Sequence, residues 1–220
     1  MYLSQTANNQ CRKSLILAIS LCASLLYGFE LSDKLLGFIE SKYGQSARSR
    51  LELWQRLATT PSQLTTIQQL NQVNVFFNRA TFKSDIQHWG QEDYWATPVE
   101  LLATNAGDCE DYSIAKYYTL KTMGISVEKL RITYVKAIRL NQAHMVLAYY
   151  ETPDAEPLIL DNLISEIKPA SQRTDLVPVY SFNGDGLWLS KQRGQGKRIG
   201  EAKKLSRWVD LNTRLLNDLK

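Results

Sequence analysis

Residues 105–111 read NAGDCED and are the part of the chain best suited to chemistry. Asp108 is a favourable helix N-cap, and Asp111 three residues later resembles the partner in a capping box. Cys109 is therefore predicted in the first turn of a helix, where free N–H groups and the helix dipole favour the nucleophilic thiolate. The same N–H groups can stabilise an oxyanion on an attacked carbonyl.

Three carboxylates beside this cysteine act in the opposite direction. The negative charges of Asp108, Glu110 and Asp111 disfavour a thiolate. A bound cation would resolve this conflict. The alternative interpretation is that these side chains cap the helix and form a solvated face.

A cysteine nucleophile needs a base, and the chain offers two histidines. His144 opens a segment of alternating polarity and ranks first, whereas His88 lies in an irregular aromatic stretch. Asp161 ends the next strand-like run, so His144 and Asp161 are expected at the same end of a sheet, beside the helix that carries Cys109, if their strands are neighbours. Each residue alone has an ordinary structural explanation, but together Cys109, His144 and Asp161 predict a nucleophilic triad.

The elements that must position this triad form an α+β pattern, with helices first and antiparallel strands after them. The first predicted helix follows Leu31 and stops at Gly44, and the second is capped by Ser46. Pro61-Ser62 opens a third helix. After the irregular stretch 82–95, helices are expected from Thr97-Pro98 to about 105 and from Asp108 to about 123.

Beyond residue 124 the apolar period changes to two, which is typical of strands. Strands are predicted at 131–138, 144–150, 157–160, 177–182 and 187–189, and Asn183-Gly184-Asp185-Gly186 is a hairpin turn signal. A closing amphipathic helix follows Leu205. The glycines 194, 196 and 200, with Lys191, Arg193, Lys197 and Arg198, are interpreted as a surface loop and not as a phosphate-binding loop.

The amino terminus resembles an export signal. Arg12 and Lys13 precede an apolar run over residues 15–26, which is short for a membrane span. We expect residues 1–28 to be a signal peptide, or alternatively an uncleaved anchor, and residues 29–220 to form one exported domain. Cys11 and Cys22 belong to the signal, so Cys109 is the one cysteine of the expected mature chain.

The composition excludes several classes of protein. The 220 residues are 44% hydrophobic, which is enough for a packed core, and the net charge of +4 is too small to indicate nucleic-acid binding. Three cysteines and two histidines exclude a disulfide scaffold and a zinc site built from several such ligands. The sequence holds no G-x-S-x-G elbow and no H-E-x-x-H motif.

Four segments together resemble one family. They read WATP at 95–98, GDCEDY at 107–112, AHMVL at 143–147 and LDN at 160–162. This combination is similar to the bacterial transglutaminase-like cysteine proteinases, and especially to periplasmic members that release biofilm adhesins. The resemblance implies a papain-like or transglutaminase-like core with Cys109 as nucleophile, His144 as general base and then acid, and Asp161 orienting the imidazole.

The resemblance also implies a substrate, a metal and a partner. The substrate would be a large adhesin, cut near its amino terminus at a pair of small residues, typically Ala-Ala. Calcium would be held by Asp108, Glu110 and Asp111, whose hard oxygens suit Ca²⁺. An inner-membrane receptor for cyclic di-GMP would sequester the protease in the periplasm.

Three aromatic residues before the catalytic helix are candidate anchors for that receptor, although burial against the helix is an equal alternative: Trp89, Tyr94 and Trp95. Two other functions are kept open. An amine acceptor in place of water would make the same triad a transglutaminase or amide-transfer enzyme. A degenerate protease would serve only as a binding module on an envelope protein.

Overall fold

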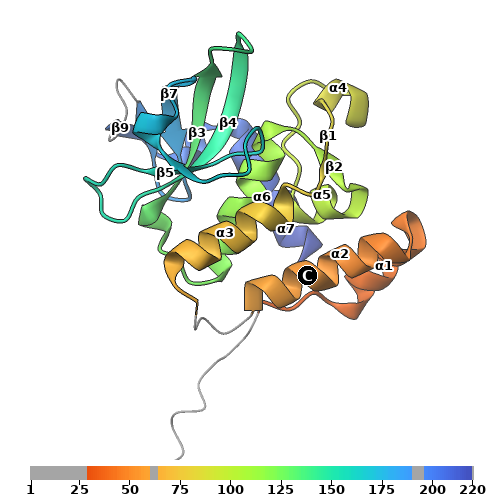
Figure 1. Cartoon of the computed structure of the whole chain (residues 1–220). Helices are drawn as coiled ribbons and strands as arrows, with labels where there is room; N and C mark the ends of the chain where they lie inside the picture. The colour runs from red at the N-terminus through yellow and green to blue at the C-terminus, as the bar shows by residue number, and fades with distance from the viewer. Residues whose placement is uncertain (1–28, 60–63, 190–195, 220) are drawn as a thin grey trace, which may run out of the picture.

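The computed structural model describes residues 29–59, 64–189 and 196–219 (Figure 1). The helices are α1 Asp33–Tyr43, α2 Gln45–Thr59, α3 Thr66–Phe77, α4 Asp85–His88, α5 Pro98–Thr104, α6 Cys109–Thr122 and α7 Ser206–Asp218. The strands are β1 Thr81–Phe82, β2 Ala106–Gly107, β3 Leu130–Ala137, β4 Gln142–Tyr149, β5 Leu158–Leu160, β6 Lys168–Pro169, β7 Leu176–Phe182, β8 Leu187–Leu189 and β9 Lys197–Gly200. The predicted α+β class is confirmed.

The first helices follow their capping signals closely. The Ser32 side chain accepts from the Leu35 N–H at the start of α1, and Gly44 ends the helix with a φ of 85°. The predicted cap of α2 at Ser46 is wrong, because α2 begins directly after Gly44, whose carbonyl already accepts from the Ala47 N–H. Thr65 and not Pro61-Ser62 caps α3, and Pro61-Ser62 lies outside the described residues.

Helix α6 lies at the centre of the molecule and is buried on nearly all sides (Figure 1). It packs against α3 and α5 and against the inner face of β4. Asp108 begins the helix as predicted, and Gly124, with a φ of 93°, follows its last turn. Its apolar side chains Ile114, Tyr117 and Leu120 are fully buried, so the body of this helix is fixed in the core.

The main sheet has the strand order β6-β5-β4-β3-β7-β8-β9, and all of its pairings are antiparallel. The predicted alternation of β4 is confirmed: Met145, Leu147 and Tyr149 enter the large core shared with α6, and Val146 and Ala148 belong to a smaller apolar cluster. His144 alternates with Met145 and so leaves β4 on the side of that smaller cluster.

The stretch 82–95, predicted as irregular, contains β1 and the short helix α4. Strand β1 pairs in parallel with β2, which directly precedes Asp108. A two-residue strand and a four-residue helix are too short to show a period in the sequence. Because β1 precedes α4 and β2 precedes α6, the pairing of these strands places α4 beside the amino-terminal end of α6.

Strand β9 corrects the prediction of a loop before the closing helix. Lys197–Gly200 pairs with β8 at the edge of the sheet. An exposed edge strand carries charged residues and little apolar alternation, so its sequence is similar to that of a loop. Lys191, Arg193 and Gly194 lie outside the described residues.

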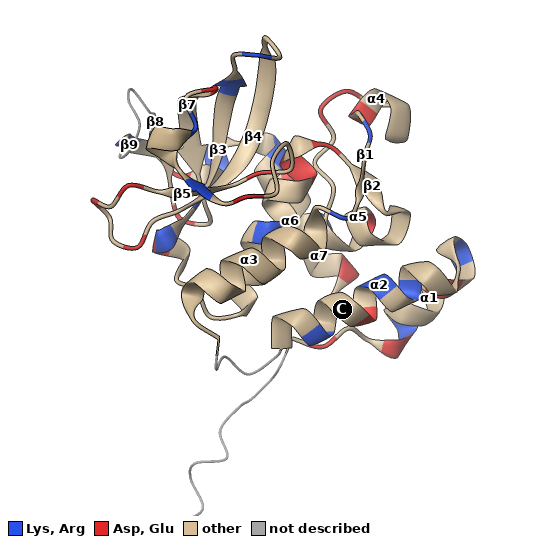
Figure 2. Cartoon of the chain, viewed as in Figure 1, with Lys and Arg blue, Asp and Glu red and all other residues tan. Residues whose placement is uncertain are grey.

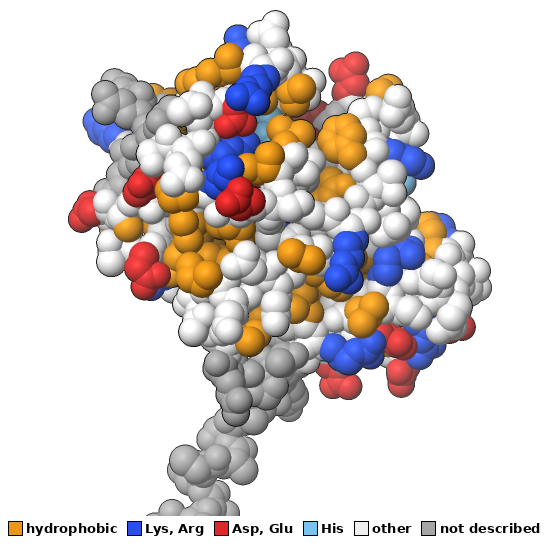
Figure 3. Space-filling model, viewed as in Figure 1, with side chains coloured by type: hydrophobic (Ala, Val, Ile, Leu, Met, Phe, Trp, Pro, Cys, Tyr) orange, Lys and Arg blue, Asp and Glu red, His pale blue; other side chains and the backbone are white. Residues whose placement is uncertain are grey.

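Charged side chains of both signs are spread over the visible face between small apolar groups (Figure 3). Among the described residues, no helix is long and apolar enough to cross a membrane. The predicted signal at 1–28 lies outside the described residues.

Candidate active site

Cys109 is the first residue of α6, and the backbone before it is tightly held. The Asp108 N–H donates to Asp111 Oδ2 at 3.1 Å, as the capping-box pattern predicts. A Cβ on Gly107 would lie 2.5 Å from the same Asp111 oxygen, so only glycine fits there without displacement. These contacts fix the direction in which the cysteine side chain leaves the helix.

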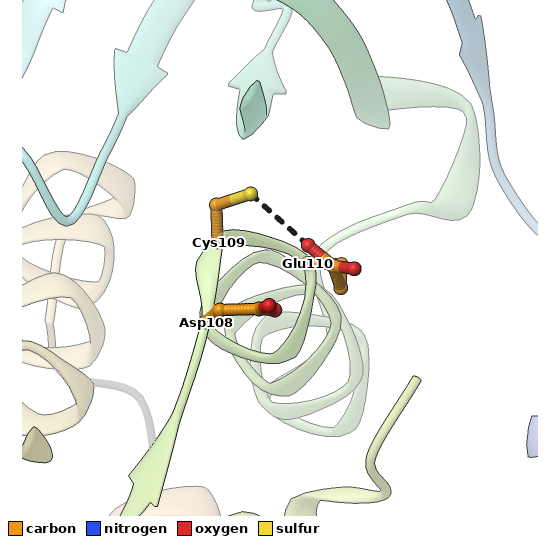
Figure 4. A group of neighbouring side chains, drawn as sticks. All are labelled: Asp108, Cys109 and Glu110. Carbon is orange, nitrogen blue, oxygen red and sulfur yellow. Dashed lines mark hydrogen bonds between the residues drawn. The ribbon is translucent and has the colours of Figure 1, made fainter. Parts of the chain in front are cut away.

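The Cys109 sulfur lies between the acidic residues and β4. Its thiol donates to Glu110 Oε2 at 3.0 Å (Figure 4), and the backbone of Met145 on β4 acts to lower the thiol pKa. Burial raises the thiol pKa well above its usual value, and the charges of Glu110 and Asp108 raise it further. The conflict predicted between the cysteine and its carboxylate neighbours is therefore present in the folded protein.

His144 and Asp161 are in direct contact. His144 Nε2 lies 2.8 Å from Asp161 Oδ1, and both residues are buried. Strand β4 pairs with β5 through Leu147 and Leu160, which brings the residue after β5 beside the first half of β4. The predicted meeting of these two residues at one end of the sheet is confirmed.

The charge state of Asp161 follows from its surroundings. Burial acts to raise the pKa of Asp161, but hydrogen bonds from His144, from the Leu163 N–H and from Arg173 outweigh it and lower that pKa to about 2. An ionised carboxylate only accepts hydrogen bonds, so His144 Nε2 carries the hydrogen. In a neutral imidazole with this hydrogen bond, Nδ1 is the nitrogen with a lone pair.

Cys109 and His144 line the same cleft, which has a volume of about 390 Å³. Its other lining residues are Phe82, Ser84, Asp93, Asp108, Glu110, Tyr134, Gln142, Ala143 and Met145. His88 is not among them: its Nε2 lies 3.0 Å from the hydroxyl oxygen of Thr104. The structure thus places His144, and not the second-ranked histidine, in the cleft that holds the cysteine.

A cluster of carboxylates lies at the start of α6. Oxygens of Asp85, Asp108 and Asp111 come within 4.8 Å of one another, and Glu110 joins Asp108 on the cysteine side. Figure 2 shows acidic segments at the beginning of α6 and at α4. Asp85 was not predicted from the sequence, because a single aspartate well upstream of the motif matches no pattern. The pairing of β1 with β2 brings it to the cluster.

These side chains fit a hard cation. Burial, reinforced by neighbouring negative charges, raises the pKa of Asp85 to about 6 and that of Asp108 to about 8. Asp85 Oδ1 and Asp108 Oδ1 are buried and have no hydrogen-bond partner. Buried oxygens without a donor, gathered among like charges, are the ligand set that a divalent ion such as Ca²⁺ prefers. Asp111 also has a structural role, since its Oδ1 accepts from the Ala96 N–H at 2.7 Å.

The candidate receptor anchors differ in exposure. Trp95 is only 5% exposed and stacks on Phe182, so its interpretation as an exposed anchor is wrong. Trp89 and Tyr94 are partly exposed, with ring centroids 4.8 Å apart. Trp95 lies against Phe182 of β7, and its carbonyl accepts from Arg214 Nη2 of α7, contacts that no local pattern reveals.

Comparison with known proteins agrees with this geometry. The family model described as bacterial transglutaminase-like cysteine proteinase matches residues 38–190. The chain belongs to this family. It is therefore a cysteine proteinase with the transglutaminase-like fold that its helices and antiparallel sheet display.

Solved structures of Legionella pneumophila LapG are similar to this cysteine proteinase at 42% sequence identity. The EGTA-treated form matches with a TM-score of 0.74 over 86% of this chain and 99% of that chain. The calcium-bound form matches with a TM-score of 0.71 over 84% of this chain and 99% of that chain. No curated protein sequence matched the chain.

Proposed function

We propose that this cysteine proteinase is a calcium-dependent endopeptidase in which Cys109 is the nucleophile, His144 the general base and acid, and Asp161 the residue that orients the imidazole. The observation that carries the proposal is the 2.8 Å contact between His144 and Asp161 at the wall of the cleft that also holds Cys109. A nucleophile, a base and an orienting acceptor are the parts that acyl transfer requires.

The reaction proceeds in two halves. His144 Nδ1 takes the thiol proton of Cys109, and the sulfur attacks the scissile carbonyl carbon. The tetrahedral intermediate collapses as the imidazolium gives its proton to the leaving amine, which leaves a thioester on Cys109. A water molecule then attacks the thioester, with His144 removing its proton, and the carboxylic acid product departs as the thiol reforms.

Asp85, Asp108, Glu110 and Asp111 would hold the calcium ion. The bound ion supplies positive charge that offsets these carboxylates and so favours the thiolate of Cys109. Support comes from the buried carboxylate oxygens that lack donors, and from the calcium-bound form of the similar LapG structure.

The proposed substrate is a large surface adhesin of the same cell, cut near its amino terminus between two small residues such as Ala-Ala, which would release the adhesin and promote biofilm dispersal. The reaction would take place in the periplasm after export by residues 1–28. Support comes from the four motifs at 95–98, 107–112, 143–147 and 160–162, and from the 42% identity to LapG.

Control by an inner-membrane cyclic di-GMP receptor is part of the same proposal. Of the three candidate anchors, Trp89 and Tyr94 are partly exposed, and Phe82, which lines the cleft, is 55% exposed. Aromatic side chains of this kind are frequent anchors in protein interfaces. Receptor binding at this surface would cover the cleft and prevent access of the adhesin.

The experiment is cleavage of an adhesin amino-terminal fragment that contains an Ala-Ala step, followed by mass spectrometry with calcium and with a chelator. Cys109→Ala and His144→Ala should abolish cleavage, and His88→Ala is the matched control that keeps it. Loss of cleavage in the chelator is expected. Joined product masses would instead favour amide transfer, and an inert Cys109 with no cleavage would favour a binding module.

A further inference from the structure

Arg173 contacts the far side of the Asp161 carboxylate. Asp161 Oδ1 accepts from His144 Nε2 and from the Leu163 N–H, whereas Oδ2 accepts from Arg173 Nη2 at 2.7 Å. The carboxylate is thus held from both ends, with the imidazole at one oxygen and the guanidinium at the other.

Arg173 is itself held by a second carboxylate, that of Asp175. Its Nε lies 3.1 Å from Asp175 Oδ1 and its Nη2 lies 2.9 Å from Asp175 Oδ2, so Asp175 binds the guanidinium in a two-pronged arrangement. Only 3% of Arg173 is exposed. Planar bidentate pairs of this kind fix the orientation of both partners, and a lysine cannot reproduce them.

The setting strengthens these contacts. Arg173 lines a small hollow formed by residues of the second apolar cluster, including Val135, Val146, Ile159 and Leu176. The buried ammonium of Lys116 on α6 also interacts electrostatically with the Asp161 carboxylate. Electrostatic contacts are stronger where water is excluded, so displacement of Arg173 would be costly.

We propose that Arg173, braced by Asp175, is a positioning residue that holds the Asp161 carboxylate at the angle needed to orient His144. The proposal rests on the roles assigned above to Cys109, His144 and Asp161. With Oδ2 bound to Arg173, the carboxylate cannot rotate, and Oδ1 stays aligned with His144 Nε2. Without the guanidinium only the contacts to Oδ1 remain, so the carboxylate gains freedom to turn and the imidazole is oriented less strictly.

The test compares Arg173→Met and Arg173→Lys in the full chain, with two readouts. The first is kcat and KM for the cleaved peptide in calcium. The second is the proton NMR signal of the His144 ring N–H held by Asp161. The chain has only two histidines, so the His88 ring signal is an internal reference. Arg48→Met is the matched control, since Arg48 also binds two carboxylates, those of Glu40 and Glu52.

Arg173→Met is expected to lower kcat by roughly 10- to 100-fold, the usual effect of removing a partner that orients a histidine, with KM little changed. The His144 signal should disappear by exchange with water while the His88 signal stays. Arg173→Lys should be intermediate in both readouts, because a lysine keeps the positive charge but cannot form the planar two-pronged contact of the guanidinium. Arg48→Met should match the unaltered chain.

A wild-type kcat together with a wild-type His144 signal in Arg173→Met would overturn the proposal. If Arg173→Met does not fold, the same result in Arg173→Lys overturns it. The NMR readout does not require cleavage. If Cys109→Ala leaves cleavage intact, the proposed function fails, and the spectrum still decides the role of Arg173.

Discussion

The Cys109 thiol donates its hydrogen bond to Glu110 Oε2 at 3.0 Å, so the proton of the nucleophile faces the acidic cluster. A carboxylate in that position stabilises the neutral thiol. A cation held by the cluster would draw on the same oxygens and reduce their effect on the sulfur. The relationship between these adjacent residues therefore connects metal binding to nucleophile activation.

Calcium should increase the reactivity of Cys109. Each unit by which the thiol pKa falls gives about tenfold more thiolate at neutral pH, so alkylation by iodoacetamide should be at least about tenfold faster in calcium than in EGTA. Glu110→Gln should alkylate faster than the unaltered chain in EGTA. Peptide mapping separates Cys109 from Cys11 and Cys22, and equal rates in calcium and EGTA would refute this connection.

Asp85 should contribute to metal binding although it lies far from the cysteine in sequence. Asp85→Asn removes one of the buried charged oxygens, so the calcium concentration for half-maximal cleavage should rise by roughly tenfold or more. Asp33→Asn changes an exposed aspartate of α1 and should leave that concentration unchanged. If both variants behave alike, Asp85 is not a ligand.

Gly107→Ala should destabilise the fold. The added Cβ would meet Asp111 Oδ2 at 2.5 Å and Leu101 Cδ1 at 2.8 Å, and overpacking of this kind costs about 1–3 kcal/mol. Gly37→Ala is the control, because nothing lies within 4 Å of its added Cβ and helix α1 gains stability there. Urea unfolding measures both free energies, and equal effects would contradict the tight packing at Gly107.

Lys116 should make stability depend on pH. Burial lowers the pKa of this lysine from its ordinary 10.5 to about 7, so between these values the unfolded chain holds a proton that the folded chain lacks. The free energy of unfolding should therefore rise with pH over this window. Lys116→Met lacks that rise.

The measurement for Lys116 is the difference in unfolding free energy between variant and unaltered chain at pH 7 and at about pH 10. The free energy of unfolding of Lys116→Met, taken relative to that of the unaltered chain, should fall as the pH rises. A difference independent of pH would show that the buried ammonium does not titrate in this window.

The sequence predicted those parts of the site that depend on local signals. The capping pattern at Asp108 placed Cys109 at a helix start, and the period of two around His144 placed it on a strand. The meeting of His144 with Asp161 followed from assuming that neighbouring strands pair.

The remaining site residues depend on contacts between distant segments. Asp85 reaches the cluster because two-residue strands pair, and no period marks them. Arg173 follows a two-residue strand and a short turn, with nothing in its neighbourhood that indicates a partner at Asp161. The burial of Trp95 depends on its stacking with Phe182, far along the chain.

The most direct test of the central claim is detection of the acyl-enzyme. The chain is mixed with the adhesin fragment in calcium, quenched in acid during turnover, and its peptides are mapped by mass spectrometry. A thioester of the amino-terminal product is expected on Cys109, absent in Cys109→Ala and strongly reduced in His144→Ala. Cleavage by Cys109→Ala at the rate of the unaltered chain, or an adduct at another residue, would contradict it.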